Sequence, residues 1–463
     1  MATPIPGPPG VPLLGNVFDI NTKDTWGSLR TLADKYGADS MTGPIFKVKA
    51  LGHQIVFIGS AALLEEICDE RRFRKCVTGP VVEIRALVHD SLFTAYHHED
   101  SWDVAHRIMA PMVSPSSTEG LMAQMNEQIA KLTAKWTATE NQRIDVTNDL
   151  QRLDLQTGIA CYFNQSVDYM DGPAPPVIAA MNNATLEAMK RPSRPKILTR
   201  LLHQRKFNKD INTLRTFAAE IIANRKSELT PKADMLNALM NTSDPVSGST
   251  LGEERVIDEI ITIFIGSATA PCLVSFAIYY LLQNTEEITR ARDEIESILG
   301  PEDEITPTNI SQFKYCEAIL REAFRLSAVA PGFNIEPIPS DEPGNVTLAD
   351  GKYEVPRNQA MIAVLHAVNR DPDVFDDPES FKPARMFGEA YDKLPSGVKK
   401  GFGNGKRQCF GRYPAWQWSL LTLIGILRRV DLISADKEYK LKQNGAFCLA
   451  PLEFFALASP RAI

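Results

Sequence analysis

The chain has 463 residues, a hydrophobic fraction of 44%, a charged fraction of 23% and a formal net charge of −7 at pH 7. Its length suggests more than one domain, because a single hydrophobic core seldom grows beyond about 250 to 300 residues. The acidic balance argues against nucleic acid or an anionic membrane as a partner, since both attract basic surfaces. Its seven cysteines include no Cys-x-x-Cys pair, which predicts a reduced intracellular protein rather than a disulfide framework.

The first 20 residues are rich in proline and contain neither a basic segment nor a long apolar run. We therefore expect an extended lead-in, with no signal peptide and no membrane anchor. The patterns that follow predict a helix over residues 25–36, a hairpin of strands over 46–50 and 54–58, and a helix over 61–68. From there to about residue 300 most of the chain has helical patterns that are interrupted at prolines.

Residues 253–283 predict a long helix whose apolar side chains go nearly all round it. Such a helix either crosses a membrane or runs through the core of a large domain. Polar residues such as Asp258, Glu259 and Thr262 interrupt it too often for a membrane span, so we expect a core helix. Pro271 lies within it and cannot donate a hydrogen bond to the carbonyl of Ser267, which predicts a kink.

Further along, residues 311–327 predict a helix that carries Glu322 and Arg325 three positions apart. On most helices such a pair is a surface ion pair. An Asp-Gly turn between residues 346–348 and 353–355 predicts a hairpin. Residues 360–365 predict another strand, and residues 445–458 predict a final pair of strands.

Residues 401–411 read GFGNGKRQCFG and precede an apolar pattern with helical spacing. The glycines allow a tight turn and a close approach to a ligand. A helix start beside Cys409 and the charge of Arg407 would both favour the thiolate over the thiol. A dinucleotide fingerprint would need glycine in place of Gln408, and a phosphate loop would need Ser or Thr after Lys406. The remaining interpretations are a metal ligand, a nucleophile, or a structural cysteine in a turn.

The whole pattern Phe-Gly-x-Gly-x-Arg-x-Cys-x-Gly resembles the haem-thiolate loop of the cytochrome P-450 family, and it is matched here by Phe402, Gly403, Gly405, Arg407, Cys409 and Gly411. The resemblance runs from about residue 12 to residue 460. Within the family, the chain resembles the haem domains of self-sufficient bacterial and fungal fatty-acid hydroxylases. It implies the cytochrome P-450 fold, mainly α with a minor β part, as a single haem domain over residues 1–463. It also implies haem b, with Cys409 as the iron ligand.

The same resemblance assigns contacts to the haem propionates. The family uses a tryptophan and a basic residue four positions later on one helix, and these match Trp102 and His106. Lys75 and Arg407 match two further propionate contacts. Nitrogen donors suit buried carboxylates, because an unpaired buried charge is costly. Taken without the resemblance, Trp102 and His106 would be interpreted as an ordinary packed or surface pair.

The resemblance also implies that Glu322, Arg325 and Arg385 form a buried three-way charge cluster behind the cysteine loop. Removing one member would leave an unpaired charge. We therefore expect these residues to be structural and to serve haem retention rather than chemistry.

The distal helix of the family normally reads Ala-Gly-x-Asp/Glu-Thr-Thr, and its acid and alcohol relay protons for dioxygen cleavage. This chain reads Ile265-Gly266-Ser267-Ala268-Thr269-Ala270. The alcohol, Thr269, is kept, whereas Ala268 replaces the acid. We take Thr269, Ala268 and Ser267 as the catalytic positions, and an alternative relay would run through Ser267, Thr269 and water.

The resemblance also implies a substrate pocket. We place the ring of Phe93 over its distal face, His53 and Phe57 at its channel mouth, and Ile265, Ala330 and Gly332 along its lining. An ordinary core role is the competing interpretation of Phe93. Relatives that bind fatty acids hold the carboxylate with Arg and Tyr where this chain has His53 and Phe57. A mostly neutral histidine and a phenylalanine weaken that clamp, so a less charged lipophilic metabolite competes with a fatty acid.

These features favour a cytoplasmic monooxygenase that inserts one oxygen atom from dioxygen into a lipophilic substrate, such as a fatty acid or a polyketide-like or terpenoid-like metabolite. Its electrons would come from NADPH through the FAD and FMN of a diflavin reductase, fused or separate. We expect a reductase domain to follow this chain in a longer protein. Because Ala268 replaces the acid, the alternative is a haem-thiolate enzyme with peroxide-dependent, isomerase or dehydratase chemistry. A haem-bearing sensor without turnover is a third hypothesis.

Overall fold

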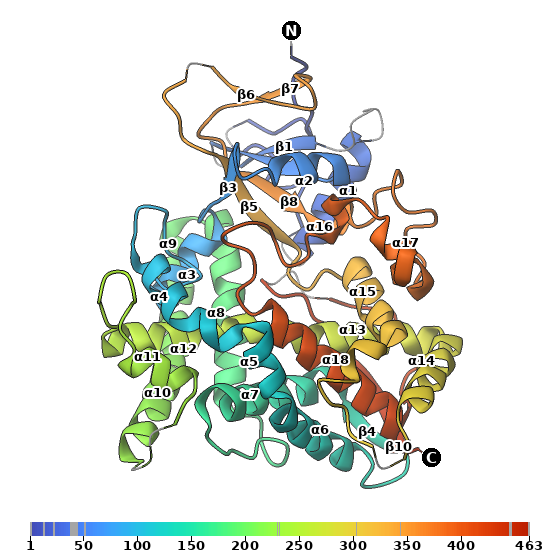
Figure 1. Cartoon of the computed structure of the whole chain (residues 1–463). Helices are drawn as coiled ribbons and strands as arrows, with labels where there is room; N and C mark the ends of the chain where they lie inside the picture. The colour runs from blue at the N-terminus through green and yellow to red at the C-terminus, as the bar shows by residue number, and fades with distance from the viewer. Residues whose placement is uncertain are drawn as a thin grey trace.

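Helices build the larger part of the molecule, and a smaller β-rich part lies at one end of it, near the N-terminus (Figure 1). The structure is a computed structural model that describes residues 2–12, 14–21, 24–37, 45–50, 52–228, 230, 232–301, 303–342, 344–443 and 447–461. This arrangement confirms the prediction of a mainly helical protein with a minor β part.

The α-helices alternate with short connections, in agreement with the proline-interrupted helical patterns of the sequence. In chain order they are α1 Thr25–Gly37, α2 Ala61–Ile67, α3 Pro80–Val88, α4 Ser101–Met109, α5 Pro115–Gly120, α6 Met122–Trp136, α7 Val146–Phe163, α8 Pro176–Lys190, α9 Lys196–Leu198, α10 Gln204–Ser227, α11 Met235–Asn241, α12 Glu253–Ser267, α13 Thr269–Gln283, α14 Thr285–Ile298, α15 Lys314–Leu326, α16 Leu365–Val368, α17 Gly388–Asp392 and α18 Arg412–Arg429.

The β-rich part is a five-stranded sheet with the order β1-β2-β8-β5-β3, accompanied by a separate hairpin. Its strands are β1 Ile45–Ala50, β2 His53–Ile58, β3 Phe73–Lys75, β5 Gly332–Pro337 and β8 Met361–Val364, and the hairpin consists of β6 Val346–Leu348 and β7 Tyr353–Val355. Both predicted hairpins are confirmed. The sheet brings early and late parts of the chain together, and its edge strand β3 ends at Lys75, a predicted haem contact.

The predicted core helix of residues 253–283 is present but is divided at Ala268 into α12 and α13. By length and composition these 31 residues could cross a membrane, yet 72% of the most apolar stretch is buried inside the protein. Helix α7 packs against both α12 and α13, and α18 packs against α13 and α6. Figure 1 shows α18 in red, crossing the helical part beside α13.

The predicted final pair of strands is wrong for the part that the structure describes; residues 445–446 lie outside that part. One strand forms there, β10 Phe455–Pro460, and it pairs with β9 Val430–Ser434 and β4 Gln142–Asp145. Both partners escaped prediction because β4 has four residues and β9 directly continues the apolar pattern of α18. The helix predicted over residues 311–327 begins at Lys314, after a 3₁₀ turn over Ile310–Gln312.

Candidate active site

The loop of residues 401–411 is a folded turn directly before α18, as its sequence predicts. Gly403 and Gly405 both adopt positive φ, 76° and 67°, which a side chain would strain. The Gly405 position also leaves room for the carboxylate of Glu70, which accepts the Lys406 N–H at 2.7 Å. The N–H of Cys409 donates to the carbonyl of Phe402 at 2.7 Å. These contacts hold the cysteine three residues before the first residue of α18.

Cys409 is half-buried. Burial raises the pKa of this thiol, whereas a hydrogen bond from the Gly411 N–H and the charges of Lys75 and Arg412 lower it. Arg407, which we expected to favour the thiolate, is not among the groups that lower this pKa, and its guanidinium donates to the carbonyls of Ala95 and Tyr96. A metal cation bound to the sulfur would favour the thiolate.

Trp102 and His106 stack on one face of α4, with ring centroids 4.6 Å apart. The His106 ring also meets Phe410, the residue after Cys409, edge to face at 5.6 Å. Burial, together with the charge of Lys406, lowers the pKa of His106. The structure therefore places this pair directly beside the cysteine loop.

Lys75, Trp102 and Arg407 line one cavity of about 230 Å³, although they come from three distant parts of the chain. Lys75 Nζ donates to the carbonyl of Arg407 at 2.7 Å, and the Arg407 guanidinium lies 4.9 Å from the Trp102 ring. Burial lowers the pKa of Lys75. Arg74 and Lys406 also line this cavity, and so do the acids Glu70 and Asp103. Four cations against two acids suit an anionic group.

The structure brings Glu322, Arg325 and Arg385 together behind the cysteine loop. Glu322 is fully buried and accepts two hydrogen bonds from Arg325, at 2.7 and 2.8 Å, while Arg385 Nε lies 3.4 Å from the same carboxylate. The backbone N–H of Lys382 donates to Glu322 as well, at 2.9 Å. The cluster is linked to the loop by α15, whose Phe324 ring packs against Phe402.

On the distal side, the break between α12 and α13 leaves an open space. Gly266 is exposed although Phe264 and Ile265 are buried, and an added Cβ at Gly266 would meet no atom within 4 Å. Thr269 Oγ1 donates to the Gly266 carbonyl at 3.0 Å. Pro271 lies in the first turn of α13, where its missing N–H accounts for an interruption at this point.

Ser267 has a partner that no pattern in the sequence indicates. Its Oγ donates to Asp154 Oδ2 at 2.9 Å, and Asp154 lies on α7, 113 positions earlier. Burial raises the pKa of Asp154 to about 7, against the lowering effect of the Ser267 hydrogen bond. The helix that lacks an acid at Ala268 is therefore in contact with an acid from another helix.

Phe93 faces a second ring that sequence reasoning missed, Phe447, edge to face with centroids 5.5 Å apart. Both rings pack against the apolar cluster that includes Ile265 and Ala268. Ala330 is half-buried beside β5. Gly332 serves packing, because a Cβ there would lie 2.4 Å from the Ala363 carbonyl and 2.7 Å from the Trp26 ring.

The assignment of Phe57 to a channel mouth is wrong. Its ring is 3% exposed and stacks on Phe46 of the neighbouring strand at 5.0 Å, inside the core. Val56 and Ile58 on either side of it are buried as well, so both faces of this end of β2 are covered by protein. His53, at the start of the same strand, is exposed.

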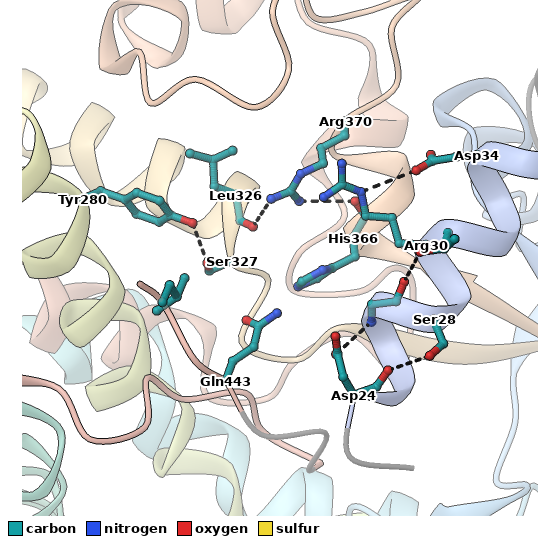
Figure 2. Close-up of a pocket in the computed structure, with 13 residues that line it drawn as sticks. Asp24, Ser28, Arg30, Asp34, Tyr280, Leu326, Ser327, His366, Arg370 and Gln443 are labelled. Carbon is teal, nitrogen blue, oxygen red and sulfur yellow. Dashed lines mark hydrogen bonds and ion pairs between the residues drawn. The ribbon is translucent and has the colours of Figure 1, made fainter. Parts of the chain in front are cut away.

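Another cavity, of about 500 Å³, lies where α1, α13, α15 and α16 meet (Figure 2). Its polar groups mostly bond to one another. Tyr280 Oη lies 2.8 Å from Ser327 Oγ, and Arg370 donates to the Leu326 carbonyl at 2.7 Å. None of the predicted site residues lines this cavity, so we do not assign the active site to it.

Comparison with known proteins identifies the family of this protein. A family model for cytochrome P-450 matches residues 5–457, and the chain belongs to that family. It is 35% identical over 465 residues to a self-sufficient cytochrome P-450 monooxygenase, CYP505U2, of Exserohilum turcicum. It is 36% identical over 466 residues to a bifunctional cytochrome P-450/NADPH–P-450 reductase, ascE, of Acremonium egyptiacum. Each match covers 99% of this chain but 42% and 43% of the respective relative, so the chain spans about two fifths of their length.

Membership of the family implies haem, and the residues present fit this group. Cys409 retains accessible surface, and a Cβ added to Gly266 on the distal helix would meet no atom within 4 Å. Lys75, Trp102 and Arg407 gather nitrogen donors at one cavity, as two propionates require. Cys409 would bind the iron, and His106 would support Trp102.

Proposed function

We propose that this chain is the haem-bearing part of a monooxygenase that inserts one oxygen atom from dioxygen into a lipophilic substrate. Electrons would come from NADPH through the FAD and FMN of a reductase, fused or separate, because the relative from Acremonium egyptiacum is named as both cytochrome and reductase. The observation that carries the proposal is the half-buried residue Cys409 in the family's loop, with the opened α12–α13 helix available for the distal side. Haem, when bound, supplies the redox chemistry.

The chain's own residues then bind, orient and hold protons. Cys409 provides the ligand, and its Gly411 hydrogen bond and the Lys75 charge favour the anionic sulfur. Thr269 holds a hydroxyl proton at the distal opening. Glu322 and its arginine partners act on stability, because they anchor α15 behind the loop without touching the cavity.

For the substrate, we propose an apolar molecule without a strong requirement for a carboxylate. Phe93, Phe447 and Ile265 supply apolar surface, whereas the buried Phe57 cannot bind a carboxylate at a channel mouth. Titrating the haem-loaded chain with dodecanoic acid and with its methyl ester tests this. We expect the ester to bind at least as tightly, and a strong preference for the acid would contradict the proposal.

The activity is tested by supplying NADPH and a soluble diflavin reductase to the haem-loaded chain with a panel of lipids and polyketide-like compounds. We expect an oxygenated product from at least one compound, and no product from the Cys409→Ser variant. Absence of product across the panel, in a protein whose reduced carbon-monoxide spectrum shows thiolate ligation, would overturn the proposal.

A second candidate follows from Ala268, which removes the usual acid from the distal helix. In this candidate the chain is a haem-thiolate enzyme with peroxide-dependent, isomerase or dehydratase chemistry. Turnover with peroxide alone, or without any NADPH, would favour it over the first. We further propose a cytoplasmic location, because all seven cysteines are free thiols, as a reducing compartment favours.

A further inference from the structure

Asp154 is a buried acid for which packing gives no reason. It lies on α7, is 9% exposed, and has Ser267 Oγ as its hydrogen-bond donor at 2.9 Å. Among the described residues, no cation lowers the pKa of Asp154; only the Ser267 hydrogen bond opposes the effect of burial. An asparagine would fill the same space with less cost, since burying an unpaired carboxyl is unfavourable. A buried acid kept in such a place is a candidate for function.

The partner of Asp154 sits at the point where this chain departs from its family. Ser267 is the last residue of α12, directly before Ala268, where relatives of the family carry an acid. The Ser267 hydroxyl is shared, because Oγ lies 3.3 Å from the Phe264 carbonyl in addition to Asp154. The groups that respond to the Asp154 charge are Tyr162 on its own helix and Cys448 on the C-terminal segment, and neither is a cation.

We propose that Asp154, acting through Ser267, is the proton-holding acid of the distal pocket and replaces the carboxylate that is missing at position 268. This inference rests on the proposed monooxygenase function. Asp154 acts through another residue, so it is a positioning and relay residue rather than a group that touches the substrate.

The two hydrogen bonds of Ser267 provide the exchange. With Asp154 ionised, Ser267 Oγ–H donates to Asp154 Oδ2, and Oγ also lies 3.3 Å from the Phe264 carbonyl. With Asp154 protonated, the acid donates to Ser267 Oγ, and the serine O–H turns away from Asp154 to a water molecule on the side of Thr269. When Ser267 passes its proton to that water, it takes the proton of Asp154. The Asp154 carboxylate then takes one proton from solvent, so one proton enters for each one delivered.

The electrostatics support this role. A pKa of about 7 lets Asp154 hold a proton near neutral pH and also release it, which is the condition for an efficient general acid. Asp149, on the same helix, is held differently. It accepts from Lys135 Nζ at 2.8 Å and from the Trp136 indole at 2.9 Å, whereas Asp154 has a serine hydroxyl as its donor.

The test compares D154N, D154E, S267A and the double variant D154N/A268E in the haem-loaded chain with its reductase. The measured quantities are product formed per NADPH, peroxide released, and the pH dependence of both. We expect D154N to lower the product-to-NADPH ratio by roughly tenfold, D154E to recover most of it, and A268E to rescue D154N. D149N is the matched control, and we expect its ratio to stay unchanged.

An infrared measurement of the carboxyl band, with and without haem, gives a readout that does not depend on turnover. We expect a protonated carboxyl band in the wild type that disappears in D154N, titrates near pH 7 and shifts in S267A. An unchanged product-to-NADPH ratio in D154N would overturn the inference while leaving the monooxygenase proposal intact. A wild type that forms no product overturns the proposed function instead. In that case an Asp154 band that titrates near pH 4 overturns the inference as well.

Discussion

The proximal and distal sides of the candidate active site satisfy a buried carboxyl group in opposite ways. On the proximal side, which carries Cys409, Glu322 is completely buried and is held by Arg325, by Arg385 and by a backbone N–H. On the distal side, formed by α12 and α13, Asp154 is nearly as buried but is held by one serine hydroxyl. The first carboxyl is fixed as an ion pair, whereas the second is left free to exchange a proton.

The carboxyl group on the proximal side therefore serves haem retention, and the one on the distal side serves the reaction. A loop that must keep its cysteine in place is stabilised by several simultaneous contacts in the segments that support it. A relay must instead contain a group that is stable in both protonation states, and such a group costs stability when charged. The proximal residues match the family pattern, and the distal ones depart from it, at Ala268, Ala270 and Pro271.

The largest expected effect is on the proximal side. E322Q removes the charged partner of Arg325, and breaking a buried pair typically costs about 3 to 5 kcal/mol. We expect a large fall in the denaturation midpoint and loss of bound haem. E389Q is the matched control, because its partner Lys393 is exposed and the pair lies on the surface. Equal midpoints for E322Q and E389Q would contradict the structural role of the cluster.

We expect D154N to change the free energy of unfolding in the opposite direction to E322Q. Burial raises the pKa of folded Asp154 to about 7, so the folded state binds the extra proton between the unfolded pKa, about 3.9, and pH 7. The stability that this group contributes is therefore present below about pH 4 and is lost as the pH rises through 7. We expect D154N to be more stable than the wild type at pH 8 by about 2 to 4 kcal/mol, with little difference at pH 4. Urea unfolding at both pH values measures it.

The loop glycines give a smaller effect. G405A puts a Cβ at positive φ and within 1.9 Å of the Glu70 carboxylate, which must release the Lys406 N–H. We expect a loss of about 2 to 3 kcal/mol. G248A is the control, because Gly248 has a similar φ of 72° but open space around its Cβ, and its cost should stay near 1 kcal/mol. Equal losses would show that the Glu70 contact adds nothing.

The smallest effect concerns the distal ring pair. F93A, F447A and the double variant form a cycle, and an edge-to-face pair is worth about 0.5 to 1.5 kcal/mol beyond its buried area. We expect a coupling energy of that size in unfolding experiments and weaker binding of apolar ligands in each variant. F18A serves as the control, because Phe18 is 78% exposed. A coupling energy of zero would show that Phe447 does not interact with Phe93 in the pocket.

The proximal side was predictable through the family resemblance, which a continuous loop motif and a fixed spacing carry. The three-residue spacing of Glu322 and Arg325 alone indicates a surface ion pair, and only the resemblance implied that the pair is buried with Arg385. The hairpins and the long core helix were predictable because their signal is local. Phe57 was misassigned because the sequence does not show that both faces of β2 are covered from Val56 to Ile58.

What the sequence could not show are contacts between distant segments. Asp154 and Ser267 are 113 positions apart, and Phe93 and Phe447 are separated by most of the chain. No periodicity links such pairs, and they meet only after α7 packs on α12 and the C-terminal segment folds back. The electrostatics of Cys409 also depend on tertiary contacts, since Lys75 comes from β3.

The most direct test of this contrast is to measure the unfolding free energy of wild type, E322Q and D154N side by side at pH 4 and pH 8. The account predicts that E322Q is less stable than the wild type at pH 8, whereas D154N is more stable at pH 8 and nearly equal at pH 4. If D154N instead loses stability at pH 8 as E322Q does, Asp154 is a structural residue like Glu322, and the distinction between the two sides fails.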